Sequence, residues 1–124
     1  MTRPSEDEYY LGLAAAVSAR GECLRRQVGC VIVKDRRVVS TGYNGAPPGE
    51  ASCLQGACPR ASSQHPHGSG YAETGCVAIH AETNAIIRGD WLAMQGATAY
   101  ISCPPCTQCA PLLRAAGIER VVTP

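Results

Sequence analysis

Two short motifs constrain this chain more than any other feature, because together they supply the ligands of a metal ion. The first, Cys-Val-Ala-Ile-His-Ala-Glu-Thr-Asn, contains His80 and Glu82, and the second, Pro-Cys-Thr-Gln-Cys, contains Cys106 and Cys109. One histidine and two cysteines make three protein ligands for zinc, and a catalytic zinc keeps its fourth position open for water. Zinc lowers the pKa of such a water toward neutrality and so makes hydroxide available as a nucleophile. Glu82 is placed to carry protons rather than to bind the metal.

The spacing of these motifs suits two helix N-termini that meet at one point. We expect one helix to begin near Ile79, with His80 at its start, and to end at Gly89. A second helix is expected to begin at Pro105, where the missing N–H costs nothing, and to end at Gly117. The two cysteines are three residues apart and therefore share a helix face, in a first turn whose free N–H groups favour thiolates.

Other metal and redox chemistries are weaker explanations of these cysteines. Cys103 and Cys106 flank two prolines and could form a redox pair, and with Cys109 they resemble the start of an iron–sulfur motif. That cluster would lack a fourth ligand nearby, and a zinc ribbon would need a second, separate Cys-x-x-Cys, whereas Cys103-Pro-Pro-Cys106 shares Cys106 with the first. The joint occurrence of His-Ala-Glu and Pro-Cys-x-x-Cys therefore favours a catalytic zinc.

Length and composition are those of one domain that acts on a small molecule. The 124 residues suffice for a single domain, 1–124, and the apolar content of 45% suits an ordinary core. The net charge is +1, no polybasic run occurs, and there is no Phe, so we expect no nucleic-acid polymer as partner. We recognise neither a signal peptide nor an apolar run near the roughly 18 residues of a membrane helix. We therefore expect a cytoplasmic protein without a membrane partner, in which eight cysteines favour metal over disulfides.

The remaining pattern predicts an α/β fold. A first helix is expected to begin at Ser5, with acidic residues in its first turn, and to end at Gly21. Asp35 and Arg36 form a polar turn between the two strands of a hairpin. Strands alternate with helices in the second half, which indicates a mixed sheet flanked by helices. The expected strands are 28–33, 38–41, 97–102 and 118–122.

Two loops have possible functional roles. Asn44 lies in a Gly-Tyr-Asn-Gly-Ala-Pro stretch that is either a connector or the wall of a pocket, where its amide offers a donor and an acceptor to a sugar hydroxyl. The second loop, 50–75, has no clear periodicity, and so long a loop is uncommon in a small domain unless it is functional or tied down. It contains four potential metal ligands, which are Cys53, Cys58, His65 and His67.

Taken together, these segments resemble the deoxycytidylate deaminase family, within the cytidine-deaminase-like superfamily. The pattern His-x-Glu…Pro-Cys-x-x-Cys is the signature of zinc-dependent nucleobase deaminases. The Gly-Tyr-Asn-Gly-Ala-Pro stretch separates this branch from the related tRNA adenosine deaminases. The matching segments cover most of the chain from residue 23 onward, and they are 27–33, 40–47, 76–86, 105–109 and 116–122.

The resemblance implies a three-layer α/β/α fold and an enzyme that releases ammonia from a cytosine ring by hydrolysis, converting dCMP to dUMP. Matched by position, zinc would be bound by His80, Cys106 and Cys109, with Glu82 as the proton shuttle. The substrate would be held by three further groups, which are the side chain of Asn44, the N–H of Ala81 and the carbonyl of Ser102.

The family often carries a second, structural zinc near the long loop, and the resemblance also implies a homo-oligomer. Ligands of that second zinc would be expected at four cysteines, with His65 and His67 as alternatives, and the cysteines are Cys23, Cys53, Cys58 and Cys76. The competing interpretation is that some of these are buried thiols, which are common. Trp91 is expected in the core.

The substrate is less constrained than the chemistry. Family members usually continue beyond the last expected strand, so we expect either a minimal or a truncated member ending at Pro124. No phosphate-binding motif is visible, and the candidates Arg25, Arg26 and Lys34 are alternatively solvated surface charges. The first alternative function is therefore deamination of a free nucleobase or nucleoside, such as cytosine, deoxycytidine or another amino-substituted heterocycle. The second is a non-catalytic zinc-stabilised binding module, and Glu82 argues against it because a purely structural site needs no adjacent acid.

Overall fold

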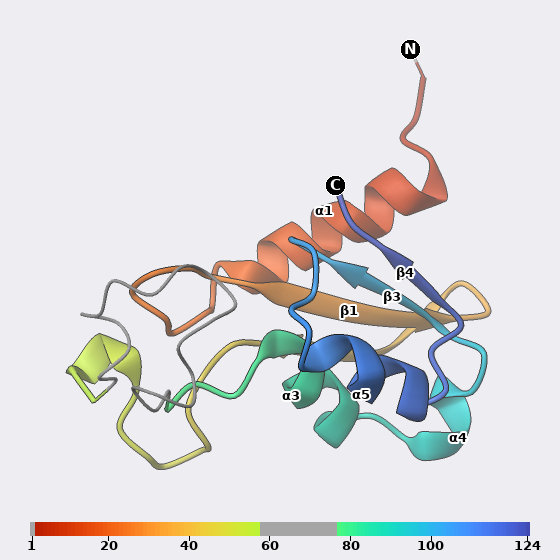
Figure 1. The fold of residues 1–124 in the computed structure, drawn as a ribbon. Coiled ribbons are helices and arrows are strands. Elements are labelled where there is room, and N and C mark those ends of the chain that lie inside the picture. The colour runs from red at the N-terminus through yellow and green to blue at the C-terminus, as the bar shows by residue number, and fades with distance from the viewer. Residues whose placement is uncertain (1, 58–76) are drawn as a thin grey trace.

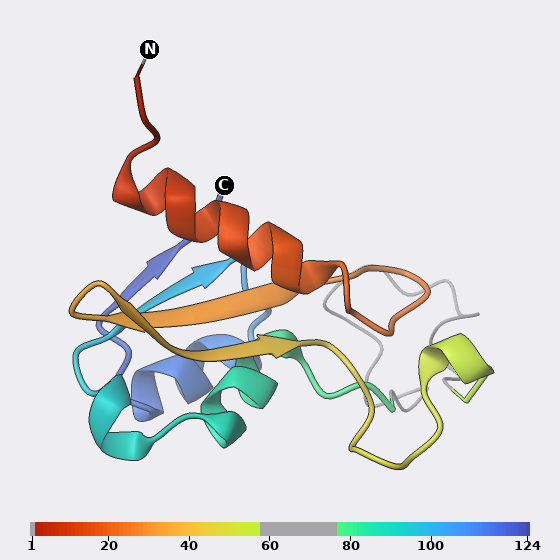
Figure 2. The same ribbon diagram turned by 180° about the vertical axis from the view of Figure 1, so that it is seen from behind.

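The computed structural model describes residues 2–57 and 77–124, in which a four-stranded sheet lies between two layers of helix (Figure 1; Figure 2). The strand order is β2-β1-β3-β4. β1 pairs antiparallel with both β2 and β3, whereas β3 and β4 are parallel. This arrangement confirms the predicted mixed sheet. The strands are β1 (Gly29–Lys34), β2 (Arg37–Tyr43), β3 (Thr98–Ile101) and β4 (Arg120–Val122).

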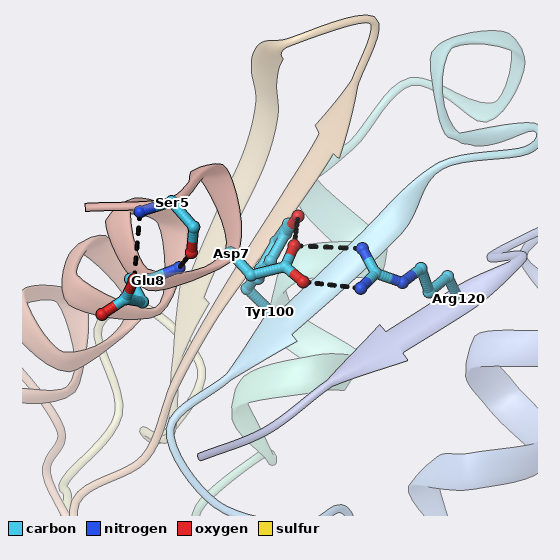
Figure 3. Close-up of polar contacts among 5 residues, drawn as sticks. All are labelled: Ser5, Asp7, Glu8, Tyr100 and Arg120. Atoms are coloured by element: carbon cyan, nitrogen blue, oxygen red, sulfur yellow. Dashed lines mark hydrogen bonds and ion pairs between the residues drawn. The ribbon is translucent and has the colours of Figure 1, made fainter. Parts of the chain in front are cut away.

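Helix α1 (Glu6–Ser18) covers one face of the sheet. Its start is a capping box, in which the Ser5 hydroxyl accepts the Glu8 N–H and the Glu8 carboxylate accepts the Ser5 N–H, each at 3.1 Å (Figure 3). The predicted start is thus confirmed. The predicted end was wrong by three residues, because the helix stops at Ser18 and the backbone tightens through Ala19 before Gly21.

The opposite face is covered by α3 (Ala81–Arg88), α4 (Trp91–Met94) and α5 (Cys109–Ala115), which lie together on the side of the sheet away from α1 (Figure 1). Alternation along β1 divides the core between the two faces, since Val31 packs toward α1 while Ile32 packs toward α3 and α5. The three-layer α/β/α prediction is therefore confirmed. No helix within the described ranges is long and apolar enough to cross a membrane.

Two glycines let the helices approach the sheet closely. A Cβ on Gly29 in β1 would overlap the Ala14 carbonyl of α1, and a Cβ on Gly42 in β2 would overlap the Ala81 carbonyl and the Ala85 amide of α3. Both neighbours are backbone atoms, which cannot swing aside as a flexible side chain would. Glycine at these positions therefore sets the distance of α1 and α3 from the sheet.

The β1–β2 hairpin closes through a two-residue loop. Lys34 pairs with Arg37, and Asp35 and Arg36 between them have φ values of 51° and 62°. Positive φ at both positions is the requirement of the tight hairpin turn whose twist matches the flanking strands. The polar turn predicted at these residues is confirmed, although Arg36 lies in a region that favours glycine.

A polar cluster joins the start of α1 to the far edge of the sheet (Figure 3). The Tyr100 hydroxyl donates to Asp7 at 2.7 Å, and the Arg120 guanidinium donates to both Asp7 oxygens at 3.0 and 2.6 Å. These contacts hold the pKa of Asp7 below its usual value, with the Arg120 hydrogen bond as the largest cause. Burial, with Asp7 beside it, raises the pKa of Tyr100 to about 12.

Trp91 was wrongly expected in the core. Its side chain is 58% exposed at the first position of α4, and Leu92 beside it is 78% exposed. The inward residue of this short helix is Met94, which is 2% exposed.

Candidate metal and active site

The candidate site lies at the end of the sheet where β1 begins and where β2 and β3 end. Beyond β2, Gly45 and Ile79 exchange backbone hydrogen bonds of 3.0 and 2.8 Å, which brings the chain to the start of α3. His80 follows as the N-cap residue of that helix. The Asn84 side chain donates to the Tyr43 carbonyl at 2.9 Å and ties the first turn of α3 to the end of β2. The predicted helix ending at Gly89 is confirmed, with its first residue at Ala81.

Helix α5 begins later than the sequence predicts. Cys109 is its first residue, whereas Pro105 and Cys106 lie in the irregular stretch before it, so a helix start at Pro105 is wrong. A helix that began at Pro105 would hold Pro111 in its interior, where proline lacks an N–H and clashes with the preceding turn, whereas in α5 Pro111 lies in the first turn. The Cys106 carbonyl nevertheless accepts the N–H groups of Cys109 and Ala110 at 3.1 and 3.2 Å. This turn keeps the two cysteines together, as the helix was expected to do.

The end of α5 is as expected. Gly117 has a φ of 93°, its N–H donates to the Arg114 carbonyl at 3.0 Å, and the Ile118 N–H donates to the Leu113 carbonyl at 3.1 Å. This pair of bonds is a Schellman motif, and buried Leu113 and Ile118 belong to the same core cluster.

The three predicted zinc ligands converge. His80 Nδ1 lies 3.0 Å from Cys109 Sγ and 3.4 Å from Cys106 Sγ. Zinc–nitrogen and zinc–sulfur bonds in a tetrahedral site place such atoms about 3.5 Å apart, so the observed spacing is close to that of a zinc site. Within the described part of the chain this is the one group of three or more His, Cys, Asp or Glu side chains close enough to hold a metal ion. Three protein ligands suit a zinc with an open position.

Electrostatics at this point also favour a cation. Glu82 is only 4% exposed, and its carboxylate lies against the Cys109 sulfur. Burial raises the pKa of the Cys109 thiol, and Glu82 and Cys106 raise it further. Two thiols and a buried carboxylate at one place can all be anionic only if a positive ion joins them. The donor set therefore fits zinc, and Cys103, Cys106 and Cys109 are not joined in disulfides.

Asn44 has a role in the fold that sequence reasoning missed. Its Oδ1 accepts the Val28 N–H at 2.9 Å and its Nδ2 donates to the Arg26 carbonyl at 2.8 Å, in a site where Asn44 is 8% exposed. The amide thus fixes the segment that leads into β1. One lone pair of Oδ1 remains for a sugar hydroxyl, and that contact stays a prediction.

The other two predicted substrate contacts are backbone groups of Ala81 and Ser102, at the same end of the sheet. Ser102 pairs with Gly29, since the Gly29 N–H donates to Ser102 Oγ and the Ser102 N–H donates to the Gly29 carbonyl, both at 3.0 Å. Ala81 is 1% exposed, and as the first residue of α3 its N–H has no acceptor within the helix. Base recognition by the Ala81 N–H and the Ser102 carbonyl stays a prediction.

Arg26 and Cys103 form a contact at the site that no motif indicated. Burial raises the pKa of the Cys103 thiol, and a hydrogen bond with the Arg26 side chain lowers this pKa by a smaller amount. Cys103 does not belong to the group of candidate zinc ligands.

A cavity of about 260 Å³ opens between the first turns of α3 and α5. It is lined by His80 and Cys109 together with Ala78, Ile79, Thr83, Gln108 and Leu112. Among the described residues, its lining includes neither Asn44 nor Glu82 nor Ser102, so it does not coincide with the predicted substrate contacts.

The predicted second zinc falls mostly outside the described residues. Cys58, Cys76, His65 and His67 all lie in the range 58–76. Of the remaining two candidates, Cys53 begins a single 3-10 turn, η1 (Cys53–Gln55), and is 1% exposed, whereas Cys23 is half-buried. The second metal stays a prediction.

Comparison with known proteins adds independent information. Residues 4–124 match the family model described as the cytidine and deoxycytidylate deaminase zinc-binding region. The deoxycytidylate deaminase of Mycobacterium phage D29 is 51% identical over 127 residues, which cover 100% of this chain and 98% of the relative. The deoxycytidylate deaminase of Saccharomyces cerevisiae is 39% identical over 98% of this chain, which spans 38% of that longer protein.

A solved structure shares the fold. The dCMP deaminase of cyanophage S-TIM5, crystallised in complex with dCMP and dUMP, superimposes with a TM-score of 0.73 at 23% identity. The match covers 99% of this chain and 83% of the other.

Proposed function

Because the chain belongs to the cytidine and deoxycytidylate deaminase zinc-binding family, we propose that it is a zinc-dependent deoxycytidylate deaminase that hydrolyses dCMP to dUMP and ammonia. The observation that carries this proposal is the similarity of the whole chain to the phage D29 deoxycytidylate deaminase, together with the convergence of His80, Cys106 and Cys109. The identity extends over 100% of this chain, so it is not confined to the metal motifs.

Each side chain at the site has a proposed role. His80, Cys106 and Cys109 would hold one zinc ion, which when bound supplies hydroxide at neutral pH from a water molecule. Glu82 would take up the proton of the attacking water, deliver it to ring nitrogen N3 and then assist the departing amino group. Its burial beside Cys109 holds the carboxylate in one place, and such acid–base help is worth roughly 10² to 10⁴ in rate.

Substrate recognition would use the edge of the sheet. The Asn44 side chain would accept a hydrogen bond from a sugar hydroxyl. The Ala81 N–H and the Ser102 carbonyl would form hydrogen bonds with the edge of the base. Rigid support for these contacts comes from the hydrogen bonds that Asn44 and Ser102 make to the segment Val28–Gly29. Groups held in this way lose little freedom when the substrate binds.

Three further properties concern the domain, its location and its assembly. We propose that 1–124 is one deaminase domain, that it works in the cytoplasm, and that it forms a homo-oligomer. Exposed Ile87, Trp91 and Leu92 on α3 and α4 are the apolar side chains that a second copy could cover. A second, structural zinc with Cys23, Cys53, Cys58 and Cys76 as ligands would tie down the long loop.

Ammonia release from dCMP, deoxycytidine and cytosine, measured with the purified zinc-loaded protein, tests the proposed substrate. Turnover of dCMP far above the other two is the expected result, whereas turnover of the nucleoside or base alone would move the protein to another substrate class. Absence of turnover with zinc bound would favour the binding-module alternative.

Two variants separate the metal from the acid. Glu82→Gln keeps the shape of the side chain but cannot carry a proton, so zinc content should be unchanged and activity lost. Cys106→Ala should lose both the metal and the activity. Full activity of Glu82→Gln would end the proposed role of Glu82.

A further inference from the structure

One carboxylate holds the turn that carries Asn44. Glu22 Oε1 accepts the N–H of Ala46 at 3.0 Å, and the Glu22 N–H donates to the carbonyl of Asn44 at 2.8 Å. Gly45 lies between these two bonds, and a Cβ built there would come within 2.5 Å of Glu22 Oε1. Glu22 therefore contacts three consecutive residues of the turn, with its carboxylate lying against Gly45.

The same turn is bonded on its other side to the residue before a candidate zinc ligand. Gly45 and Ile79 exchange backbone hydrogen bonds of 3.0 and 2.8 Å, and His80 follows Ile79 directly. The turn after β2 thus lies between the Glu22 side chain and the segment that leads to His80. Since Asn44 is the proposed contact for the sugar, the position of this turn sets the spacing between the sugar contact and the metal.

The N–H that Glu22 binds is the last backbone donor before two prolines. Pro47 and Pro48 follow Ala46, and neither has an N–H with which to hold the chain. Their rings also restrict the backbone, and Pro47 restricts Ala46 before it. A bond to the Ala46 N–H therefore fixes the direction in which a stiff segment leaves the site.

Charge pairing does not account for Glu22. The residue is half-buried, and the two ion pairs found within the described residues engage Glu6 and Asp7 as their acids. Partial burial of a carboxylate without an ion pair costs free energy unless the group accepts hydrogen bonds. A backbone N–H donated to an ionised acceptor makes one of the stronger hydrogen bonds in proteins. The contribution of this carboxylate is thus its bond to the turn.

On the basis of the function proposed above, we propose that Glu22 is a positioning residue, which holds Asn44 in place to bind the 3′-hydroxyl of dCMP. The 5′ carbon of dCMP carries the phosphate and the 2′ carbon carries only hydrogen, so the 3′-hydroxyl is the one sugar hydroxyl of this substrate. Glu22 acts on the sugar only through Asn44. A hydrogen bond between neutral groups contributes about 0.5–1.5 kcal/mol, which corresponds to about 2- to 12-fold in kcat/KM.

Two substitutions separate the length of the Glu22 side chain from its charge. Glu22→Gln keeps the length and an oxygen acceptor but removes the charge, whereas Glu22→Asp keeps the charge but is one methylene shorter. The substrates are dCMP and its 2′,3′-dideoxy analogue, which lacks the 3′-hydroxyl. Glu22→Asp should lower kcat/KM for dCMP about 2- to 12-fold and leave kcat/KM for the analogue nearly unchanged. Glu22→Gln should keep most of the preference for dCMP.

Glu50→Asp is the matched control, because it shortens an exposed carboxylate six residues after Asn44 and should change neither value. Zinc content and urea unfolding show whether each variant retains its metal site and its fold. If Glu22→Asp does not fold, Gly45→Ala makes the same test, since its Cβ would displace the Glu22 carboxylate from the turn. An equal loss on both substrates would overturn the proposal, and so would a loss of preference in Glu22→Gln as large as that in Glu22→Asp.

The outcomes keep this inference apart from the proposed function. If the unaltered enzyme turns over dCMP and its dideoxy analogue equally well, Asn44 binds no 3′-hydroxyl, so the role of Glu22 is refuted while the deaminase function stands. An unchanged preference for dCMP in Glu22→Asp refutes that role in the same way. If the zinc-loaded, unaltered enzyme turns over neither substrate, the proposed function and the inference that rests on it both fail.

Discussion

Gly42→Ala should destabilise the fold and weaken zinc binding together, because Gly42 is where α3 rests on the sheet. A Cβ at this position would overlap the Ala81 carbonyl oxygen and the Ala85 amide nitrogen and would lie 2.9 Å from Ala85 Cα. All three are atoms of the helix backbone. The added methyl therefore cannot be accommodated by a rotamer change, and α3 has to move away from β2.

The expected size follows from overpacking. Forcing one extra carbon into a closely packed contact typically costs 1–3 kcal/mol, so the free energy of unfolding should fall by about that amount. His80 is the N-cap of α3, while Cys106 and Cys109 come from the separate segment at the start of α5. A displacement of α3 should therefore pull His80 Nδ1 away from the two sulfurs and lower the zinc affinity.

Gly12→Ala provides the matched control. A Cβ on Gly12 in α1 meets nothing within 4 Å, so the same chemical change there should raise the free energy of unfolding by about 0.5–1 kcal/mol through helix propensity. Urea unfolding of the zinc-loaded proteins gives the stabilities, and competition with a chelator gives the zinc affinities. A Gly42→Ala protein as stable as the parent, with equal zinc affinity, would refute the close contact between α3 and β2.

Three further changes test other parts of the structure. Asp7→Asn should reduce stability at neutral pH and make stability depend less on acid. The pKa of Asp7 in the folded protein lies below the ordinary 3.8, so the stabilisation by its carboxylate is complete above pH 3.8 and is lost as the pH falls below that value. Urea unfolding of both proteins from pH 3 to 7 measures this difference, and parallel stability curves would count against the role of Asp7. Arg36→Gly should raise the free energy of unfolding by about 0.5–1 kcal/mol, since relief of the positive φ outweighs an exposed ion pair with Glu6; a lower urea midpoint would disprove this. Cys53→Ser should lower the metal content from about two to about one zinc per chain and destabilise the fold if the second site exists, and an unchanged content would exclude Cys53 as a ligand.

Local patterns predicted most of the regular structure correctly. The capping box at Ser5 and Glu8, the apolar run of β1 and the glycine after α5 are signals carried by neighbouring residues, and each appears where expected. The zinc ligands were also predictable, because one histidine and a Cys-x-x-Cys pair leave few alternatives. Their convergence at 3.0 and 3.4 Å is a spatial fact that the motifs anticipated.

What the sequence did not reveal depends on contacts between distant segments. The late start of α5 is a local exception, because Pro111 would lie in the interior of a helix that began at Pro105 but lies in the first turn of one that begins at Cys109. The structural role of Asn44 depends on bonds to Arg26 and Val28, 18 and 16 residues away. No periodicity records such bonds. Trp91 was expected in the core because large apolar residues are usually buried. It lies instead on the four-residue helix α4, whose one buried residue is Met94.

The cluster of Asp7, Tyr100 and Arg120 has a consequence for the order in which the protein can fold on the ribosome. Asp7 and Arg120 are 113 residues apart, so the Asp7 carboxylate in α1 can pair with Arg120 only after β4 has been synthesised. Meanwhile α1 and the β1–β2 hairpin can already associate, but the edge of β1 that later receives β3 stays unpaired while some 60 further residues are synthesised. A nascent chain in this interval exposes an unpaired strand edge, which favours aggregation, and the pairing of β3 with β1 covers that edge.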